Sequence, residues 1–452
     1  MVQSLLEKMR KYSFWSLDFL KGGRVRSHYK DIAFILENYT SEASQNRRDE
    51  LLHNLLTHAV STTVFYAPFK NFKTLSDFPV INKSIIRDHK EDVLSSTYMG
   101  KNNREISTSG SSGTPFTTLQ NKAKEERNTA DTIYFKKKAG FEVGYRLYYI
   151  RKWFKMHTKS NLTTWLRNIK MVDVTEFSDE YLSDFITTVK KDDSTKVFLA
   201  YSSALREICN YLERTGATPI KADISCIIAM SEALSDRTRA QLEKYFDAPV
   251  LSRYSNLENG ILSLQLPGGG DLFHINWASY YIEILHPDKD IPVAHGEVGR
   301  VVVTDLFNHC MPMIRYDTGD LAIMSGENEY FNGAPGFLKV EGRKMDVIYK
   351  TDGRIQSPFI IFHLEPYADI KQFQLIQEER KKYILKLNVE QGFDKGQELI
   401  AMLKSYLGTD ADVQIDFVQG IPQLSSGKRR LTVNNYLKEK IDESLKPQIE
   451  NV

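Results

Sequence analysis

Strand-like and helical segments alternate through the middle of this 452-residue sequence. Two continuous apolar runs, Lys196–Tyr201 and Ile224–Met230, have the length and composition of buried strands. Each run is followed by a segment with helical spacing, at residues 202–215 and 235–246. Because such alternation is typical of βαβ units, it predicts an α/β fold with a largely parallel sheet flanked by helices.

The two ends of the sequence have other patterns. The first hundred or so residues predict helices joined by short loops, and Ser41 is placed to cap one of them. Helices are expected at residues 41–59, 83–94 and 123–139, and strands at 280–285, 299–305 and 315–324. Beyond these, strands are expected near 345–361, 372–377, 382–389 and 412–418, with a helix at 395–407. We therefore expect a large domain at residues 1–342 and a small α+β domain at residues 343–452.

Composition and charge exclude several classes of protein. Lys and Arg total 60 against 58 Asp and Glu, so the chain lacks the basic excess of most nucleic-acid-binding proteins. No apolar stretch approaches the roughly 18 residues that span a membrane. Charged residues such as Lys8 and Asp18 interrupt the region where a signal peptide would have its apolar core.

Cysteine usage predicts a cytoplasmic protein. Cys209, Cys226 and Cys310 lie far apart in the sequence, which argues against a disulfide framework and favours a reducing compartment. His309 precedes Cys310, but a structural zinc site needs four grouped ligands, and the sequence does not group them. We interpret Cys310 as a buried thiol beside a polar loop residue.

Residues 107–114 read Ser-Thr-Ser-Gly-Ser-Ser-Gly-Thr. Glycines let the backbone curl so that several N–H groups point one way, and hydroxyls add donors, which makes a concave site for phosphate oxygens. No Lys follows Gly113, so the Walker class of nucleotide-binding loop is disfavoured. A flexible Ser/Gly linker is the alternative interpretation. The adjacent Pro115 and the strand-like residues before the stretch favour an ordered loop.

Four downstream stretches, at 253–260, 315–322, 342–348 and 422–429, complete the set of candidate motifs. Taken singly, each has an ordinary interpretation. Glu258 could be a surface acid, Asp320 a residue of a tight Asp-Thr-Gly-Asp turn, Arg343 a solvated charge and Lys428 one of many lysines. The order and spacing of all five stretches together favour a shared function.

Together the five stretches resemble those of the adenylate-forming superfamily of acyl- and aryl-CoA ligases, luciferases and peptide-synthetase adenylation domains. Within it the chain looks most like the phenylacetate–CoA ligase branch, including ligase-like proteins of capsular-polysaccharide gene clusters. The resemblance runs from about residue 80 to about residue 435. It implies a large N-terminal adenylate-forming domain that binds ATP and a carboxylate, and a small mobile lid that carries a catalytic lysine.

The resemblance implies an ATP-dependent ligase that forms an acyl- or aryl-adenylate. The acyl group would then pass to coenzyme A or to an amine or hydroxyl acceptor, and polysaccharide biosynthesis is one implied setting. A homodimer is a further family-level expectation. The alternative is a non-catalytic nucleotide-binding relative that acts as a partner in polysaccharide assembly, although retention of Glu258, Asp320 and Lys428 together argues against it.

The resemblance also implies a role for each matched residue. Glu258 would hold Mg²⁺ that bridges the phosphates, Tyr254 would flank the adenine and Asp320 would accept hydrogen bonds from the ribose. Lys428 would reach the carboxylate and the α-phosphate. Met230-Ser-Glu-Ala233 matches a short adenine-facing loop. The implied nucleotide-binding residues are Ser109, Gly110, Ser111, Ser112, Gly113, Thr114, Ser231, Glu232, Tyr254, Asp320 and Arg343, and the implied catalytic residues are Glu258 and Lys428.

This chemistry explains the residue types. The attacking carboxylate is already ionised, so no general base is needed, and the difficulty is to bring an anion to a polyanion. Mg²⁺, backbone N–H groups and one mobile cation overcome it by electrostatic stabilisation and positioning. A Ser-His-Asp triad has no part in such a reaction.

The sequence departs from the family pattern in three places. Many relatives have a Lys in or just after the phosphate loop, where this chain has Thr114 and Phe116. Met345 stands where an acidic hinge residue is expected, and the Tyr-Gly-Leu-x-Glu form common in this branch reads Tyr-Ser-Asn-Leu-Glu. The acid is expected to bind near Tyr134, Tyr201 and Ser202. Aromatic residues in such a pocket admit either an aryl group or an alkyl chain.

Overall fold

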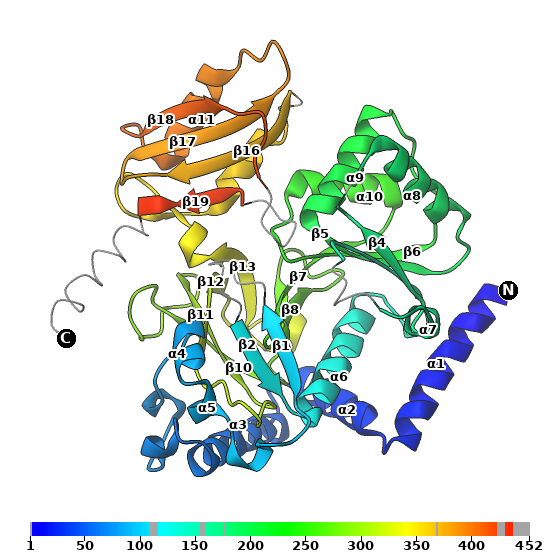
Figure 1. Ribbon diagram of the computed structural model, residues 1–452, viewed down its shortest axis with the longest axis vertical. Coiled ribbons are helices and arrows are strands. Elements are labelled where there is room, and N and C mark those ends of the chain that lie inside the picture. The colour runs from blue at the N-terminus through cyan, green and yellow to red at the C-terminus, as the bar shows by residue number, and fades with distance from the viewer. Residues whose placement is uncertain are drawn as a thin grey trace. The chain divides into compact units, whose positions relative to one another are not determined.

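The computed structural model describes residues 2–108, 116–153, 159–175, 177–367, 369–422 and 430–436. The chain divides into two compact units, and β-strands run through both. The first unit comprises residues 1–318 and 322–340, and the second comprises residues 319–321 and 341–452. Each unit has a hydrophobic core of its own. The helices and strands of both units are drawn in Figure 1.

An eleven-stranded mixed sheet forms the largest element of the fold. Five neighbouring strands are parallel, in the order β4-β3-β5-β6-β7, and the pairs from β7 through β8 and β9 to β13 and between β10 and β11 are antiparallel. The prediction of an α/β fold is confirmed, and the sheet is mixed, with parallel pairing through these five strands. The bounds are β3 Arg146–Arg151, β4 Ile169–Asp173, β5 Lys196–Tyr201, β6 Ile224–Met230, β7 Val250–Asn256, β8 Gly260–Gln265, β9 Phe273–Ile275, β10 Tyr280–Leu285, β11 Val298–Asp305, β12 Tyr316–Met324 and β13 Gly336–Arg343.

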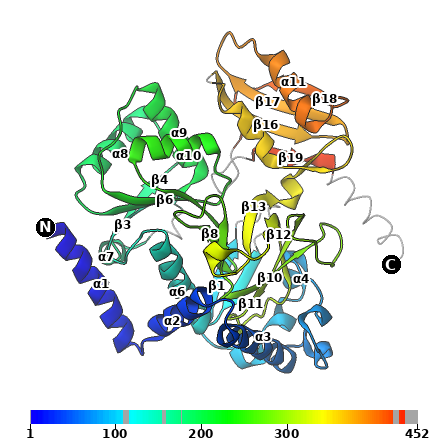
Figure 2. The same cartoon turned by 180° about the vertical axis from the view of Figure 1, so that it is seen from behind.

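Helices α8, α9 and α10 lie together against the parallel strands (Figures 1 and 2). They span Asp179–Lys191, Ser202–Arg214 and Asp236–Phe246. The Ser178 and Ser235 side chains cap α8 and α10 by accepting backbone N–H hydrogen bonds. The observed bounds of α9 and α10 confirm the predicted helices at 202–215 and 235–246 within one residue at each end.

The N-terminal third of the chain is mostly helical, as predicted. Its helices are α1 Val2–Leu20, α2 Arg24–Glu37, α3 Glu42–Thr62, α4 Lys83–Asp88, α5 Lys90–Val93 and α6 Lys122–Lys138, followed by α7 Asn161–Leu166. Ser41 caps α3 by accepting a hydrogen bond from the Ser44 N–H. The single helix predicted at 83–94 is instead two short helices, because His89 between them leaves the helical conformation. Strands β1 Arg104–Thr108 and β2 Phe116–Gln120 form an antiparallel hairpin on either side of residues 109–115.

The second unit is built on a four-stranded sheet with the order β18-β17-β16-β19. Its elements are β14 Ile348–Tyr349, β15 Ile355–Gln356, β16 Ile370–Gln377, β17 Lys382–Val389, α11 Gly396–Leu407, β18 Asp412–Phe417 and β19 Thr432–Asn434. The strands expected across 345–361 are reduced to the two-residue strands β14 and β15, because a tight turn separates them and a 3₁₀ helix begins at Pro358. That 3₁₀ helix spans Pro358–Leu364, and others in the chain span Ala67–Phe69, Leu75–Asp77, Ser96–Tyr98, Glu329–Phe331 and Lys344–Asp346.

Candidate functional site

Glu258 lies in the turn between β7 and β8, and only 2% of its surface is exposed. Its Oε1 accepts a hydrogen bond of 2.8 Å from the Tyr316 hydroxyl and lies 3.0 Å from the Nζ of Lys83. A carboxylate taken out of water needs such compensation, since an unpaired buried charge is strongly destabilising. Helix α4, the β7–β8 turn and strand β12 therefore meet at this carboxylate.

Lys83 is a site residue that the sequence reasoning missed. It is the first residue of α4, directly after the N-cap Asn82, and 37% of its side chain is exposed. Its Nζ lies 5.6 Å from the ring centroid of Phe116, the residue that follows segment 109–115. One feature of the sequence could have pointed to Lys83. Where many relatives have a Lys, in or just after the phosphate loop, this chain has Thr114 and Phe116, so a cation would have to come from another segment.

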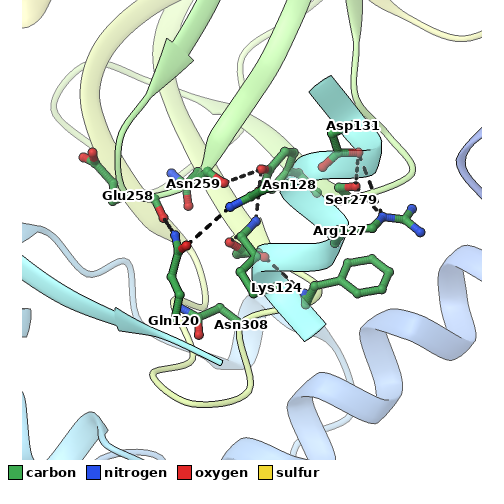
Figure 3. Close-up of polar contacts among 12 residues, drawn as sticks. Gln120, Lys124, Arg127, Asn128, Asp131, Glu258, Asn259, Ser279 and Asn308 are labelled. Carbon is green, nitrogen blue, oxygen red and sulfur yellow. Dashed lines mark hydrogen bonds and ion pairs between the residues drawn. The ribbon is translucent and has the colours of Figure 1, made fainter. Parts of the chain in front are cut away.

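A network of polar contacts holds the backbone of the turn that contains Glu258 (Figure 3). Gln120 Nε2 donates to the Glu258 carbonyl oxygen at 2.8 Å. The Tyr280 hydroxyl donates to the Asn259 carbonyl oxygen at 2.6 Å and itself accepts a hydrogen bond from Lys124 Nζ at 3.1 Å. The turn is therefore fixed at two consecutive carbonyl groups.

Helix α6 anchors this network in the core of the first unit. Lys124 forms a fully buried ion pair of 2.6 Å with Asp305. Arg127 donates to Ser279 Oγ at 2.8 Å, and Ser279 Oγ donates to Asp131 at 2.7 Å (Figure 3). Arg127 also contacts Asp31 of α2 at 2.6 Å. Burial raises the pKa of Asp131 in spite of the nearby Arg127. These buried contacts connect α6 to α2, to β11 and to the residue directly before β10.

Tyr254 connects β7 to β12 at a second point. Its hydroxyl donates to Thr318 Oγ1 at 3.3 Å, and Thr318 Oγ1 donates to the Val301 carbonyl oxygen at 3.0 Å. The Tyr254 ring meets the Phe337 ring edge-on, with centroids 6.1 Å apart. The 253–260 and 315–322 motifs, which the sequence analysis could relate only by order, are thus in contact through Tyr254–Thr318 and Glu258–Tyr316.

The tight turn predicted around Asp320 is wrong. Residues 317–320 lie inside β12, which continues without interruption to Met324. Gly319 has a φ of 79°, so the strand contains a local irregularity that a residue with a Cβ would rarely adopt. Asp320 and Arg343 both belong to the second unit, and Arg343 is exposed at the end of β13.

The carboxyl ends of β5 and β6 bring Ser202 and Glu232 together. Ser202 Oγ donates to the Glu232 carbonyl oxygen at 2.9 Å, and Glu232 Oε2 accepts a hydrogen bond of 3.0 Å from the Ser203 N–H. The carboxylate thus satisfies the N-terminus of α9, where a negative charge is favourable. Ser231 has a φ of 71°, a strained conformation for a residue other than glycine and one that clusters at functional sites.

Positive charge gathers near the same strand ends. The Arg151 guanidinium lies 5.9 Å from the Tyr201 ring centroid, and Arg253 Nη2 lies 3.2 Å from Met230 Sδ. Burial, together with the nearby Arg253, lowers the pKa of Lys136 to about 7. Burial and the nearby Arg151 also hold the pKa of Arg253 below its usual range. This region is electrostatically suited to an anion.

Tyr134 lies elsewhere than the expected acid pocket. It is buried among residues of the α2–α6 contact, where its ring centroid is 5.8 Å from that of Tyr29 and its hydroxyl lies 3.5 Å from Glu37. Burial is the largest cause of a raised pKa for its hydroxyl, and Glu37 adds to it. These contacts give Tyr134 a structural role between two helices, and Tyr201 and Ser202 remain the pocket candidates.

Several predicted site residues lie outside the described residues. These are Ser109, Gly110, Ser111, Ser112, Gly113 and Thr114 of the phosphate loop, and Lys428 of segment 423–429. Among the described residues, no group of three or more His, Cys, Asp or Glu side chains could hold a metal ion. Mg²⁺ commonly uses one or two carboxylates together with substrate phosphates, so a single buried Glu258 fits that donor set.

The chain is similar to several known proteins. Residues 347–435 match the family model described as the CapK C-terminal domain. Over 446 residues the chain is 23% identical to Protein CapK of Staphylococcus aureus, with 92% of this chain and 94% of the relative covered. Phenylacetate-coenzyme A ligase of Escherichia coli (strain K12) is 27% identical over 163 residues, which are 33% of this chain and 36% of the relative.

Solved structures of ligases share the fold. A crystal structure of 2-hydroxyisobutyryl-CoA ligase in the postadenylation state, in complex with R3-HIB-AMP, matches with a TM-score of 0.68 and 15% identity, covering 90% of this chain and 93% of that one. Anthranilate CoA ligase AuaEII in complex with anthranoyl-AMP matches with a TM-score of 0.52 and 14% identity, covering 76% and 67%. The chain has the fold of adenylate-forming ligases, and the predicted resemblance to this superfamily is confirmed.

Proposed function

We propose that this chain, with its adenylate-forming fold and its CapK-type C-terminal domain, activates a carboxylic acid with ATP. The observation that carries the proposal is the buried Glu258 carboxylate, held by Lys83 and Tyr316 where the 253–260 and 315–322 motifs meet. Lys83 compensates the buried charge of Glu258, and it also lies beside Phe116, the residue that follows the Gly/Ser-rich segment 109–115. A site for a polyanion needs both a cation and a metal-binding carboxylate there.

In the proposed reaction the substrate carboxylate oxygen attacks the α-phosphorus of ATP. The bond from that phosphorus to the bridging oxygen breaks, and pyrophosphate leaves with the electron pair. Glu258 would hold Mg²⁺, which when bound screens the charge of the phosphates. The loop at 109–114 would donate N–H groups to the β- and γ-phosphates, and Lys83 would add the cation that this loop lacks.

The other candidate residues would bind the nucleoside and the substrate acid. Asp320 would accept hydrogen bonds from the ribose hydroxyls, and Tyr254 and Ser231 would line the adenine side. The positive region around Arg151 and Arg253 would attract the substrate acid. Lys428 would neutralise charge on the carboxylate and the α-phosphate during the attack.

The proposed second step transfers the acyl group to coenzyme A. Support comes from the named relatives, since both a curated relative and the neighbouring structures are described as CoA ligases. A thiolate would attack the acyl carbon and AMP would leave. A cytoplasmic setting, a homodimer and a contribution to polysaccharide biosynthesis remain proposals that rest on the resemblance of the sequence motifs.

A panel of aryl, hydroxy, fatty and amino acids tests the proposal. Exchange of labelled pyrophosphate into ATP, dependent on one acid and on Mg²⁺, is the expected result. Adding coenzyme A should then convert exchange into net AMP release. Tight ATP binding without exchange for any acid of the panel would favour the non-catalytic alternative. Glu258→Gln keeps the shape but removes the charge, and should lower exchange far more than it lowers the thermal stability.

A further inference from the structure

The first helix of the chain, α1, exposes an apolar face that nothing in the described part of the first unit covers. Leu5, Met9, Tyr12 and Leu20 lie along one side of it, at the spacing of a helical face. The exposed fractions of Tyr12 and Leu20 are 69% and 78%. Exposed apolar side chains are ordinary when scattered, but a contiguous row of them marks an interaction surface.

The opposite side of α1 is firmly seated on the first unit, so this exposure does not come from a detached helix. Glu7 accepts a hydrogen bond of 2.9 Å from the Thr195 N–H, and Lys11 forms an ion pair of 2.8 Å with Glu142. Asp18 accepts hydrogen bonds from the N–H groups of Val25 and Arg26 at the start of α2. These contacts fix the rotation of α1 and turn its apolar face outward.

Helix α7 lies beside α1 and extends the same surface (Figures 1 and 2). The Arg10 guanidinium of α1 lies 5.9 Å from the Trp165 ring centroid. Trp165 is 65% exposed, and Leu162 and Leu166 of α7 are exposed as well. We call the apolar faces of α1 and α7, with the basic residues that flank them, the α1–α7 surface.

The exposed charges of α1 are of one sign. Both acidic residues of α1, Glu7 and Asp18, are buried in the contacts described above, whereas Lys8 of α1 and Lys21 directly after it are exposed. From Val143 to Val172 the sequence has no Asp or Glu and seven Lys or Arg, of which Arg146 pairs with Asp192 and Arg151 lies by Tyr201, away from α7. Chain-wide, the formal net charge is only +2, so this local excess is not a consequence of composition.

We propose that the α1–α7 surface binds the face of an anionic phospholipid bilayer. An amphipathic helix with apolar side chains on one face and Lys and Arg beside them lies in the interfacial plane of a membrane. Tryptophan prefers the headgroup level, and each basic residue near an anionic leaflet adds to the attraction. None of the helices in the described part of the chain is both long and apolar enough to cross a bilayer, so this would be a contact from one side.

A second copy of the chain fits the α1–α7 surface less well than a bilayer does. A symmetric dimer brings the same patch of both copies together. Lys8, Arg10 and Arg167 would then face cations of the other copy, and two acids on this side of the unit, Glu7 and Glu142, already contact the Thr195 N–H and Lys11. An anionic lipid surface supplies the opposite charge without this conflict.

Sedimentation of the full chain with vesicles tests the proposal. Vesicles of phosphatidylcholine with phosphatidylglycerol should bind at least about tenfold more protein than vesicles of phosphatidylcholine alone. Raising the salt to about 1 M, where the screening length falls to about 3 Å, should remove most of this difference. Binding that is absent, or equal on both kinds of vesicle, would overturn the proposal.

Two substitutions locate the contact. Tyr12→Glu and Trp165→Glu should each lower binding to the anionic vesicles about tenfold or more. Ile291→Glu changes an apolar residue on the β10–β11 connection that is 54% exposed; it is the control and should bind as the wild type does. A loss of the same size in the Ile291→Glu variant would overturn the assignment to this surface.

Two further measurements protect the test against misfolded variants. On the unmodified chain, anionic vesicles should shift tryptophan emission to the blue, and brominated lipids should quench it. Trp165→Phe should remove most of both effects, although Trp15, Trp153 and Trp277 remain. If vesicles have no effect and the chain instead forms a dimer that Tyr12→Glu dissociates, a second copy occupies the surface and the proposal is wrong.

Discussion

Replacing Lys83 by Met removes the cation that compensates the buried carboxylate of Glu258. Because the lysine is partly exposed, we expect a loss of roughly 1–3 kcal/mol in the free energy of unfolding, below the cost of breaking a fully buried pair. We also expect a higher KM for ATP, since the same ammonium is proposed to meet the phosphates. Urea unfolding and steady-state kinetics measure the two effects separately.

The double variant Lys83→Met with Glu258→Gln separates the structural from the functional role of Lys83. Removing both charges should recover most of the lost stability, because no unpaired charge remains buried. Activity should stay low. Lys90→Met, on the neighbouring helix α5, is the control for loss of an exposed lysine. Recovery of activity in the double variant would contradict the proposed roles of both Lys83 and Glu258, because neither charge remains.

Asp320 and Asp317 offer a matched pair within one strand. Asp317 is paired with Arg300 at 2.7 Å, whereas Asp320 is proposed to bind the ribose. Hydrogen bonds to a charged group contribute about 1.5–3 kcal/mol, so Asp320→Asn should raise the KM for ATP by about one to two orders of magnitude. Asp317→Asn should lower stability and leave that KM nearly unchanged. An equal effect of both variants on KM would refute the ribose role.

At the scale of secondary-structure elements, the structure shows where sequence patterns suffice. Strands β5 and β6, with the helices after them, were predicted because each apolar run and each cap is local in sequence. The division of residues 83–94 at His89 was missed, whereas the strand expected at 315–324 is present as β12, without the turn that was expected inside it at Asp320. Lys83 was missed as a site residue because its partner lies 175 positions further along the chain.

Lys136 of helix α6 makes the free energy of unfolding depend on pH. Burial lowers the pKa of Lys136 from 10.5 to about 7 in the folded chain. Between these two values the unfolded chain binds more protons, so this residue makes the protein more stable as the pH rises from about 7 to about 10.5. Lys136→Met should therefore stabilise most at or below pH 7 and progressively less above it.

Urea unfolding of the wild type and the Lys136→Met variant at several pH values measures this difference. Lys137→Met removes a lysine from the exposed side of the same helix and serves as the control. A stability difference that is the same at every pH would contradict the proposed burial of the Lys136 ammonium. The comparison within one helix isolates this residue from other groups that titrate in the range.

At the scale of the whole molecule, the candidate site is assembled from segments far apart in the sequence. Lys83, Glu258 and Tyr316 meet within the first unit, whereas Asp320, Arg343 and Lys428 belong to the second. The order of the motifs could be recognised in the sequence because it depends only on residue identity. Which side chains touch could not, because strand pairing across the large sheet sets those distances.

Lys428→Ala should abolish adenylate formation yet leave conversion of a supplied acyl-adenylate to the thioester nearly unchanged. A lysine is a compact charge on a long flexible stem, suited to delivery by a lid that moves as a whole. Once pyrophosphate has left, its contact with the phosphates and carboxylate is no longer required. Pyrophosphate exchange measures the first step, and thioester formation from added adenylate measures the second. Lys371→Ala, an exposed lysine of the same unit, should alter neither step, and an equal loss of both steps in Lys428→Ala would contradict the division of labour between them.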